Sequence, residues 1–402
     1  MKIKLAVLFG GKSVEHEVSV ISALQAMENL NSEKYDIIPV YIGKNGEMFT
    51  GEFLRDPDEY KNIPALLKKS TAVNFVLRDG KTILERKNKK TFGSNDITEV
   101  EIAFPIVHGT NVEDGVLQGF LKTVGLPFVG CDVLSSAVGM DKYVMKAMLK
   151  DGGFPVLDCV RLRRSAYVDR DRSIELVEAK LEYPVIVKPV NLGSSVGISK
   201  ASDRDSLFKS LDEAFTYADT VIVEKAVVKL REINCSVVGD VDSAEASECE
   251  EPFMCDEILS YKDKYMGGSK GTKSGGSKGM ASLARKVPAD LTPEMRERIR
   301  GLAVDAFKHL GCSGISRIDF MIDEADGSLY INEFNTIPGS LSFYLWKPVG
   351  VEYTQLLDRL ISIALKRNRN ESEITYSFDS NILSMGVLKG SKGTKGAKGA
   401  KM

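Results

Sequence analysis

The sequence predicts an α/β amino-terminal domain built on a parallel sheet, followed by an α+β region of two lobes. Two observations predict this fold class. Strand and helix patterns alternate over the first 130 residues, and short strands separated by helices follow them. The 402 residues are 43% hydrophobic and 27% charged, which is typical of a globular protein long enough for two or three domains.

Buried-strand runs and helical patterns alternate in the first domain. The runs "KIKLAVLF", "YDIIPVYIG" and "EIAFPIVHG" predict strands at 2–9, 35–43 and 101–109. Helices are predicted over 16–30 and 116–125, and this order is that of a parallel sheet covered by helices. A charged, poorly patterned insert at about 51–98 interrupts the alternation.

Shorter elements fill the rest of the chain. In order, we expect a helix over 135–153, strands over 184–190, 220–227 and 232–240, a helix over 292–311, a hairpin of strands 314–323 and 328–335, and a last helix over 352–368. The paired glycines Gly152 and Gly153 predict the end of the first of these helices. The expected domains are therefore 1–130, a central lobe 131–220, a carboxy-terminal lobe 221–370, and an extension 371–402 whose Gly/Lys-rich tail is disordered from about 388.

Composition excludes several classes of protein. A net charge of −2 gives no reason to expect nucleic acid or an anionic membrane as the main partner. No apolar run reaches the ~18 residues of a membrane span, and the first residues are too polar for a signal peptide, so we expect a cytoplasmic protein. The six cysteines form no CxxC pair, and Cys131, Cys159 and Cys235 are expected to be small core residues.

Two stretches could bind anions. "LFGGKSVEHE" follows a strand and opens a helix, so its backbone amides could hold an anion; the alternative is a tight strand-to-helix turn. It matches neither GxGxxG nor GxxxxGK[ST]. Lys188 lies inside the apolar strand of "VIVKPVNLGSSVGI" and needs an anionic partner there. A polyphosphate suits a lysine beside a loop of small residues; a structural ion pair with a carboxylate is the alternative.

The hairpin carries the strongest local signal. Arg317 and Asp319 share one strand face, as do Glu333 and Asn335. With "DEADG" as a five-residue connection, Ile322 pairs with Ser328 and Arg317 lies opposite Glu333. All four polar groups then point from one face, and their oxygen ligands suit Mg²⁺ shared with phosphates. The alternative is an Arg317–Glu333 salt bridge beside surface acids.

The motifs together resemble a known family. In order they are "GGKSVEHEVS", "HGTNVEDG", "MDKYVMK", "YPVIVKPVNLGSSVGI", "VEKAVVKLREINCSVVG", "KDKY", "SRIDF" and "NEFNTIPG". From about residue 5 to 365 this series resembles the D-alanine–D-alanine ligases of the ATP-grasp superfamily. The resemblance implies a Rossmann-like first domain, an ATP-grasp module of two lobes, and a homodimer. It also implies a ligase that uses ATP and two Mg²⁺ (or Mn²⁺) to join two D-alanines through an acyl phosphate, for peptidoglycan.

Position by position, the resemblance implies the following roles. The expected ATP contacts are Lys142, Lys188, Glu224, Lys225, Ala226, Val227, Glu232, Lys264 and Asn332, with Lys264 in a lid over 260–283. The expected metal ligands are Asp319, Glu333 and Asn335. Glu15, Ser194 and Tyr265 resemble the triad that holds the first D-alanine, Arg317 and the Gly339 amide resemble the oxyanion stabilisers, and His108 resembles a histidine near the first substrate's carboxylate.

The acceptor segment departs from the family. A serine hydroxyl usually binds the second D-alanine's carboxylate, but in "SLSFYLWKP" the aligned positions are Tyr344 and Leu345. Ser340, Ser342 and Tyr344 are therefore the candidate acceptor contacts. The alternatives are a related ligase that accepts D-serine, D-lactate or another amino acid, and an ATP-binding regulatory protein with a degenerate site. Tyr265 favours an amino acid over a hydroxy acid, and the complete lysine and acid set argues against the regulatory protein.

Overall fold

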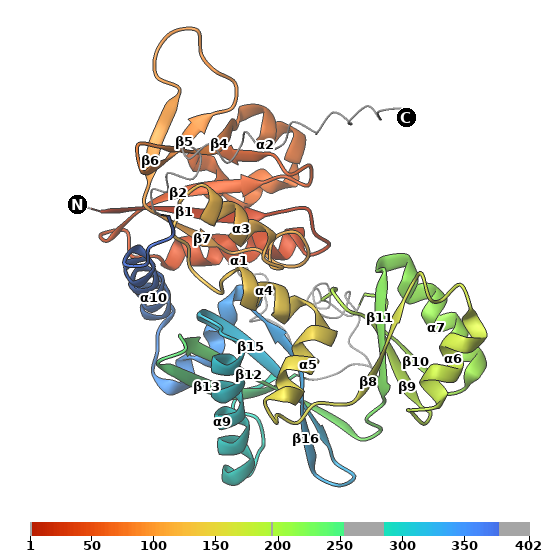
Figure 1. The fold of residues 1–402 in the computed structure, drawn as a ribbon. Helices are drawn as coiled ribbons and strands as arrows, with labels where there is room; N and C mark the ends of the chain where they lie inside the picture. The colour runs from red at the N-terminus through yellow and green to blue at the C-terminus, as the bar shows by residue number, and fades with distance from the viewer. Residues whose placement is uncertain (1, 194–195, 253–284, 378–402) are drawn as a thin grey trace, which may run out of the picture. The chain divides into compact units, whose positions relative to one another are not determined.

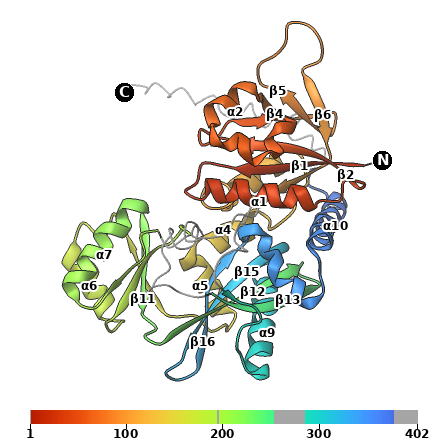
Figure 2. The same cartoon turned by 180° about the vertical axis from the view of Figure 1, so that it is seen from behind.

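The computed structural model describes residues 2–193, 196–252 and 285–377. Residues up to Leu365 form one compact unit, and those from Lys366 belong to a second. Figures 1 and 2 show the fold from opposite sides. The described residues of the first unit form three sheets. None of the helices within the described ranges is long and apolar enough to cross a membrane.

The first sheet has seven strands in the order β6-β5-β4-β3-β2-β1-β7. The strands are β1 Ile3–Gly10, β2 Tyr35–Ile42, β3 Met48–Thr50, β4 Thr71–Arg78, β5 Lys81–Arg86, β6 Asp96–Val100 and β7 Ile102–Pro105. The helices are α1 His16–Asn29, η1 Glu52–Arg55, η2 Pro57–Lys61, α2 Ile63–Lys69 and α3 Val116–Thr123. β2, β1 and β7 are parallel, which confirms the predicted strands and their relation.

The predicted parallel sheet is confirmed in part. β3, β4, β5 and β6 add to β2 in antiparallel fashion, so the sheet is mixed. The strands β4, β5 and β6 come from the segment predicted to be an insert. Val73 and Phe75 on β4 are buried while Asn74 between them is exposed, which is the alternation of a strand with one covered face. The open face of β4 also carries Ala72 and Val76, and charged residues are frequent in β5 and β6, so no clean period is visible in the sequence.

The second sheet has four strands in the order β10-β9-β11-β8. They are β8 Cys159–Arg163, β9 Val185–Pro189, β10 Ser199–Ala201 and β11 Thr220–Lys225, with helices α6 Arg170–Glu178 and α7 Arg204–Tyr217. Apolar side chains of both helices and all four strands share one core. Cys159 is half-buried rather than a core residue, whereas Cys131 and Cys235 are buried as expected.

Two helices replace the single one predicted over 135–153. They are α4 Val133–Met140 and α5 Lys142–Asp151. The break falls at Asp141, whose side chain accepts hydrogen bonds from the Tyr143 and Val144 amides and so starts a new helix. This cap fixes the start of α5, so Lys142 is the first residue of the helix.

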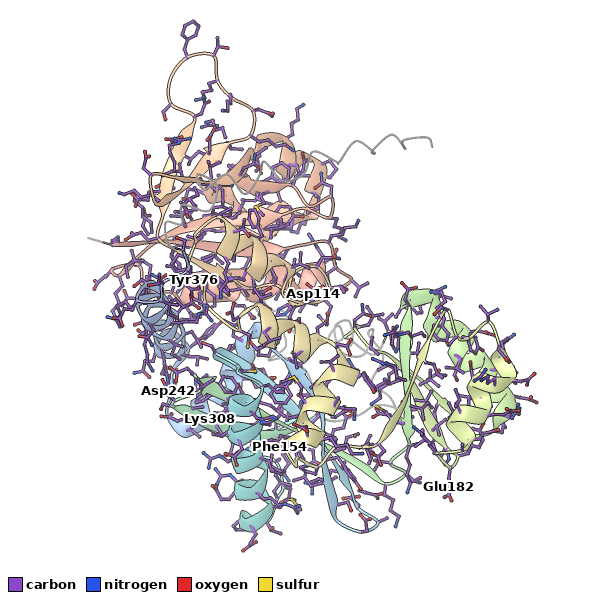
Figure 3. All side chains as sticks on the ribbon, in the orientation of Figure 1. Asp114, Phe154, Glu182, Asp242, Lys308 and Tyr376 are labelled. Atoms are coloured by element: carbon purple, nitrogen blue, oxygen red, sulfur yellow. The ribbon has the colours of Figure 1, made fainter. Side chains whose placement is uncertain are left out.

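The third sheet has five antiparallel strands in the order β14-β13-β12-β15-β16. They are β12 Leu230–Gly239, β13 Ala244–Pro252, β14 Arg285–Lys286, β15 Gly314–Asp323 and β16 Ser328–Asn335; α9 Pro293–His309 packs on β12, β13 and β15. Lys308 on α9 and Asp242 in the β12–β13 turn are labelled in Figure 3. Lys308 Nζ donates to the Asp242 carbonyl at 3.4 Å. The chain then continues through η4 Gly339–Leu345, η5 Lys347–Val349 and α10 Tyr353–Ser372.

The two faces of the third sheet differ in chemistry. Cys249, Cys235, Ile318 and Phe334 lie side by side across four strands and are buried in the core shared with α9. Because side chains alternate along a strand, the neighbouring row of residues points to the opposite face. That row is polar, and it carries the candidate site.

The predicted hairpin register is corrected by a shorter turn and a bulge. Asp323, not Ile322, pairs with Ser328, because Gly327 takes a left-handed conformation (φ 75°) and its amide donates to the Asp323 carbonyl at 2.8 Å. A β-bulge after Asp319 shifts the register again. Asp319 therefore lies opposite Glu333, and Arg317 lies opposite Asn335.

Candidate active site

A row of four polar residues crosses the third sheet. Glu250 pairs with Asn234, Asn234 with Asp319, and Asp319 with Glu333. We call this set, from β13, β12, β15 and β16, the polar row. Directly paired residues share a sheet face, so the four side chains point to one side. The prediction that the hairpin's polar groups share a face is confirmed, and the row extends it by two strands.

Arg317 and Asp319 form the centre of this face. The guanidinium donates to both carboxylate oxygens, Nε to Oδ1 at 2.6 Å and NH2 to Oδ2 at 2.7 Å. Asn335 Nδ2 donates to the same Oδ2 at 3.0 Å. Burial lowers the pKa of Arg317, but the paired carboxylate outweighs it and raises that pKa, so the guanidinium stays cationic. The predicted alternative, an Arg317–Glu333 salt bridge, is not the pairing found.

Lysines from outside the third sheet meet the Glu333 end of the polar row. Lys142 Nζ, at the start of α5, lies 3.2 Å from Glu333 Oε2 and donates to the Leu192 carbonyl at 2.8 Å. Lys188 Nζ, from β9, donates to Asn332 Oδ1 at 3.1 Å. The bulge after Asp319 inserts Asn332 as an extra residue beside Glu333. A bulge re-aims side chains, and here two consecutive residues each contact one lysine.

Glu224 binds two buried lysines at the end of β11. Its carboxylate pairs with Lys146 Nζ at 2.8 Å and also with Lys188 Nζ. Burial raises the pKa of Glu224, but the two ammonium groups reverse the shift and lower it to about 2. Each of the two carboxylate oxygens contacts one ammonium group. Because an ionised carboxylate can accept about four hydrogen bonds, these two contacts leave acceptor capacity at Glu224.

Glu15 lies between two glycine-containing loops. It directly precedes α1 and is 7% exposed. A Cβ atom at Gly193 would lie 3.2 Å from its Oε2, and one at Gly109 would lie 2.9 Å from the same oxygen. Gly109 also has φ 86°, so glycine is required there on two grounds. The motifs "GGKSVEHE" and "HGTNVEDG" and the residue Gly193 therefore converge on one carboxylate.

His108 joins the first sheet to the segment after β16. Its Nδ1 lies 2.8 Å from the Ile337 carbonyl, which can only accept, so Nδ1 carries the proton. Its Nε2 then accepts from Ser22 Oγ at 3.0 Å, and Ser22 Oγ in turn accepts from the Ser340 amide. Burial lowers the pKa of His108, which fits a neutral ring. Both ring nitrogens thus bind protein groups, and these contacts favour positioning of the 337–340 segment.

Glu113 supports the same segment from the loop after His108. Its Oε1 accepts from the Ile337 amide at 2.9 Å and from Thr336 Oγ1 at 3.4 Å, and its Oε2 accepts from the Gly109 amide at 3.0 Å. Desolvation raises the pKa of Glu113 to about 8. A single carboxyl group thereby links "HGTNVEDG" to "NTIPG".

The 340–342 backbone is left-handed. Ser340, Leu341 and Ser342 have φ values of 50°, 52° and 46°, which costs roughly 1–2 kcal/mol for each residue. Ser340 Oγ donates to Gln25 Oε1 at 2.7 Å, while Ser342 Oγ is buried without a partner among the described residues. Tyr344 is different, because its hydroxyl donates to Glu250 Oε1 at 3.1 Å. Of the three acceptor candidates, Tyr344 is thus the one whose hydroxyl contacts the polar row.

The remaining predicted residues fall into two groups. Glu232 is half-buried on β12 on the same face as Asn234 and contributes to the raised pKa of Lys188. Lys225 is exposed at the end of β11, Ala226 is buried with its amide donating to the Pro184 carbonyl, Val227 is half-buried, and Gly339 starts η4. Ser194, Lys264 and Tyr265, the lid over 260–283 and the tail from 388 lie outside the described residues.

Comparisons with known proteins identify the family. A model of the D-ala D-ala ligase N-terminus matches residues 4–131, and one of the D-ala D-ala ligase C-terminus matches residues 148–362. A D-alanine–D-alanine ligase of Caldicellulosiruptor bescii is 39% identical over 386 residues, covering 94% of this chain and 99% of the relative. One from Thermosipho melanesiensis is 36% identical, covering 96% and 100%. The chain belongs to the D-alanine–D-alanine ligase family.

Solved structures of this family have the same fold. The VanG D-Ala:D-Ser ligase of Enterococcus faecalis matches with a TM-score of 0.74 at 32% identity, over 90% of this chain and 100% of that one. The D-alanine-D-alanine ligase of Coxiella burnetii matches with a TM-score of 0.73 at 28% identity, over 96% and 99%.

Four residues of this D-alanine–D-alanine ligase family member were not predicted from the sequence. They are Lys146, Glu113, Glu250 and Arg285. Lys146 could have been found, because it lies one helical turn after Lys142 in "MDKYVMK". Glu250 could not have been found, because its place in the same row as Asp319 depends on how β13 and β15 each pair with β12. Arg285 has no motif around it and gains its place from the short pairing of β14 with β13.

Proposed function

We propose that this chain is an ATP-dependent ligase that joins two D-alanines through an acyl phosphate to make D-alanyl-D-alanine for peptidoglycan. The observation that carries the proposal is the polar face of β15 and β16. Arg317, Asp319, Glu333 and Asn335 gather there, and Lys142 and Lys188 approach from other elements. Names of the relatives, D-alanine–D-alanine ligases over nearly their full length, support the same reaction.

The side chains present suit each step. A carboxylate is a poor electrophile, so ATP must first convert it to an acyl phosphate. Lys142 and Lys188 would neutralise phosphoryl oxygens, and Glu15 would bind the ammonium group of the first D-alanine. Attack by the second amine creates an oxyanion, for which Arg317 offers a permanently charged donor and Gly339 an amide. Phosphate then leaves.

The nucleotide base fits the end of β11. Each carboxylate oxygen of Glu224 contacts one ammonium group, and a carboxylate oxygen can accept a further hydrogen bond, for which an exocyclic amino group is a suitable donor. The backbone of Lys225, Ala226 and Val227, which directly follow Glu224, would lie alongside the base. Glu232 on β12 is a suitable acceptor for the ribose hydroxyls. Lys264 would act on the terminal phosphate from the lid.

The metal ligands fit a cation that is shared with phosphate. Asp319 and Glu333 supply carboxylate oxygens and Asn335 an amide oxygen, which are ligands that Mg²⁺ prefers. Among the described residues no three His, Cys, Asp or Glu side chains gather around one point, so the protein alone would not complete the shell. We propose two Mg²⁺, with Mn²⁺ as a substitute, whose chemistry is to neutralise charge on the phosphates.

The proposal is tested by phosphate release from ATP with D-alanine as the sole amino acid. We expect one phosphate for each dipeptide formed, and no release without D-alanine. Absence of dipeptide under these conditions would overturn the proposal. An ATP-binding regulatory protein with a degenerate site would give that result while still binding ATP.

A second acceptor is favoured by two observations. Tyr344 occupies the position of the expected serine, and a D-Ala:D-Ser ligase is among the structural neighbours. D-serine, D-lactate and other amino acids should therefore be compared with D-alanine in the same assay. The division into domains near 130 and 220, a cytoplasmic location and a homodimer remain part of the proposal; sedimentation at several concentrations tests the last.

A further inference from the structure

The acceptor end of the site is assigned by the direction of the polar row, on the basis of the proposed function. Lys142 and Lys188 gather at the Glu333 end, so the phosphoryl group belongs there. Arg317 lies in the middle, where the oxyanion forms. The acceptor amine must reach the same carbonyl carbon from the side that the phosphate does not occupy. That side is toward β12 and β13.

The polar row ends on that side at Glu250. Adjacent strands lie ~4.8 Å apart, so Glu250 on β13 is about 10 Å from Asp319 on β15. Arg317 lies within this gap, because Tyr344 and Glu250 both contribute to the raised pKa of its guanidinium. An α-amino acid, whose amine and carboxylate are separated by a single carbon, needs its carboxylate site only a short distance from the reacting carbonyl. A carboxylate-binding group near Glu250 would thus place the amine near Arg317.

Arg285 is the cation at this end. Its NH1 donates to Glu250 Oε2 at 2.8 Å, and its guanidinium carbon lies 4.0 Å above the centre of the Tyr344 ring. Its side chain is 10% exposed. A guanidinium held by a carboxylate on one side and by an aromatic ring on another has restricted freedom, and a restricted guanidinium suits recognition of a carboxylate.

Tyr344 does not replace the family's serine atom for atom. Its hydroxyl donates its one proton to Glu250 Oε1, and Asn234 Nδ2 donates to the same oxygen at 3.0 Å. Burial and the Glu250 carboxylate raise the pKa of Tyr344, so this proton stays on the hydroxyl. Relative to the serine that the resemblance implies, Tyr344 therefore offers the acceptor no hydroxyl donor but places an aromatic ring against Arg285.

We propose that Arg285 binds the carboxylate of the acceptor amino acid, and that Glu250 and Tyr344 are positioning residues that hold the guanidinium in place. The class of acceptor that follows is an amino acid with a free carboxylate. An amide or a simple amine lacks the group that Arg285 recognises.

The test separates the two half-reactions in the full-length enzyme. Dipeptide formation from D-alanine reports both substrate sites. Hydroxylamine, which has no carboxylate, traps the acyl phosphate as a hydroxamate and reports ATP and the first D-alanine alone. The variant Arg285→Gln should raise the acceptor KM by about 30-fold or more, while the rate of hydroxamate formation changes less than about two-fold. Arg285→Lys should recover part of the loss.

Controls keep the outcomes distinct. Lys286→Gln changes the next residue, whose ion pair with Asp290 is exposed, and should leave both rates unchanged. The double variant Arg285→Gln/Glu250→Gln removes both partners, so it leaves no buried unpaired charge and guards against misfolding. The wild type should also prefer D-alanine over D-alaninamide as acceptor, and the double variant should lose this preference.

An unchanged acceptor KM, or a parallel fall in hydroxamate formation in both the single and the double variants, overturns the assignment of Arg285. If the wild type forms neither dipeptide nor hydroxamate, it is the proposed ligase reaction that fails.

Discussion

The two ends of the polar row obtain their countercharges from different places. At the Glu333 end the cations belong to α5 and β9, which are not strands of the third sheet. At the Glu250 end the partners are Arg285 on β14 and Tyr344 on η4, which are close neighbours of β13. The first end is built from the motifs that resemble the family, and the second departs from them.

The two ends therefore differ in what a substrate would do on binding. At the Glu333 end it would replace an existing ion pair, whereas at the Glu250 end it would bind beside contacts that stay in place. Lys142 is paired with Glu333, so in the proposed reaction phosphate and metal would each take over one partner of that ion pair. Glu250 instead accepts hydrogen bonds from three neighbours, and Arg285 keeps its orientation through both the ion pair and the ring. We therefore expect substitutions at the Glu333 end to abolish chemistry and those at the Glu250 end to alter acceptor use.

The largest effect is expected from Glu333→Gln. It removes a negative ligand from the phosphoryl end, and a loss of several kcal/mol of transition-state stabilisation corresponds to a fall in kcat of about 10³-fold. Circular dichroism should show an intact fold, because Glu333 is only part-buried. Glu324→Gln, in the exposed turn of the same hairpin, is the matched control. Near-normal turnover in Glu333→Gln would remove the metal assignment.

A large loss of stability is expected from Lys146→Met. It leaves Glu224 with only one of two buried ammonium partners, and breaking a buried pair costs about 3–5 kcal/mol. Lys150→Met is the control one turn further along α5, where the pair with Asp158 is exposed on both sides and no measurable change is expected. Urea unfolding at pH 7 measures both. Equal stabilities would mean that Lys188 alone compensates Glu224.

Sequence patterns predicted the strands and helices in which apolar residues recur at a regular spacing. β15 and β16 lie at the predicted residues, since Ile315, Phe320 and Ile331 mark buried strands clearly. The helix boundary at Asp141 was missed, because an Asp inside an apolar period can be either a surface residue or a cap. The strands between 71 and 100 were missed because apolar residues on both faces of β4 and charged residues within β5 and β6 hide the alternation.

Sequence motifs predicted which residues gather on the polar face of the hairpin, but not their contacts. Arg317 was expected opposite Glu333, yet it lies opposite Asn335 and binds Asp319, because the bulge and the four-residue turn shift β16 by one position and then another. Such shifts depend on local turn energies that no motif records. Long-range partners such as Lys146 with Glu224 require two elements to be packed before the pairing exists.

A moderate effect is expected from Tyr344→Phe. It keeps the ring beneath Arg285 and removes only the hydroxyl that donates to Glu250, which corresponds to about 1 kcal/mol. We expect the acceptor KM to rise about five-fold, with hydroxamate formation unchanged. Tyr344→Ser restores the residue that the resemblance implies but removes the ring, so it should be the more damaging of the two. A smaller defect in Tyr344→Ser would show that the hydroxyl matters more than the ring.

A pH-dependent effect on stability concerns Glu113, which holds the segment between β16 and the acceptor end. Its pKa is about 8 in the fold, above the usual value of 4.5, because desolvation disfavours the charged form. Below about pH 4.5 both folded and unfolded states are protonated. As pH rises toward 8 the unfolded chain loses its proton first, so the stability contributed by this group is lost over that window.

Glu113→Gln cannot ionise and should lack this pH dependence. Between pH 5.5 and 7.5 the wild type should lose stability relative to the variant by about 0.5–1 kcal/mol per pH unit, a slope reduced for the partial exposure of the side chain. Urea unfolding at three pH values measures the difference. A constant gap would mean that the three donors from Gly109, Thr336 and Ile337 keep the carboxylate charged, and the link between "HGTNVEDG" and "NTIPG" would then be an ionic one.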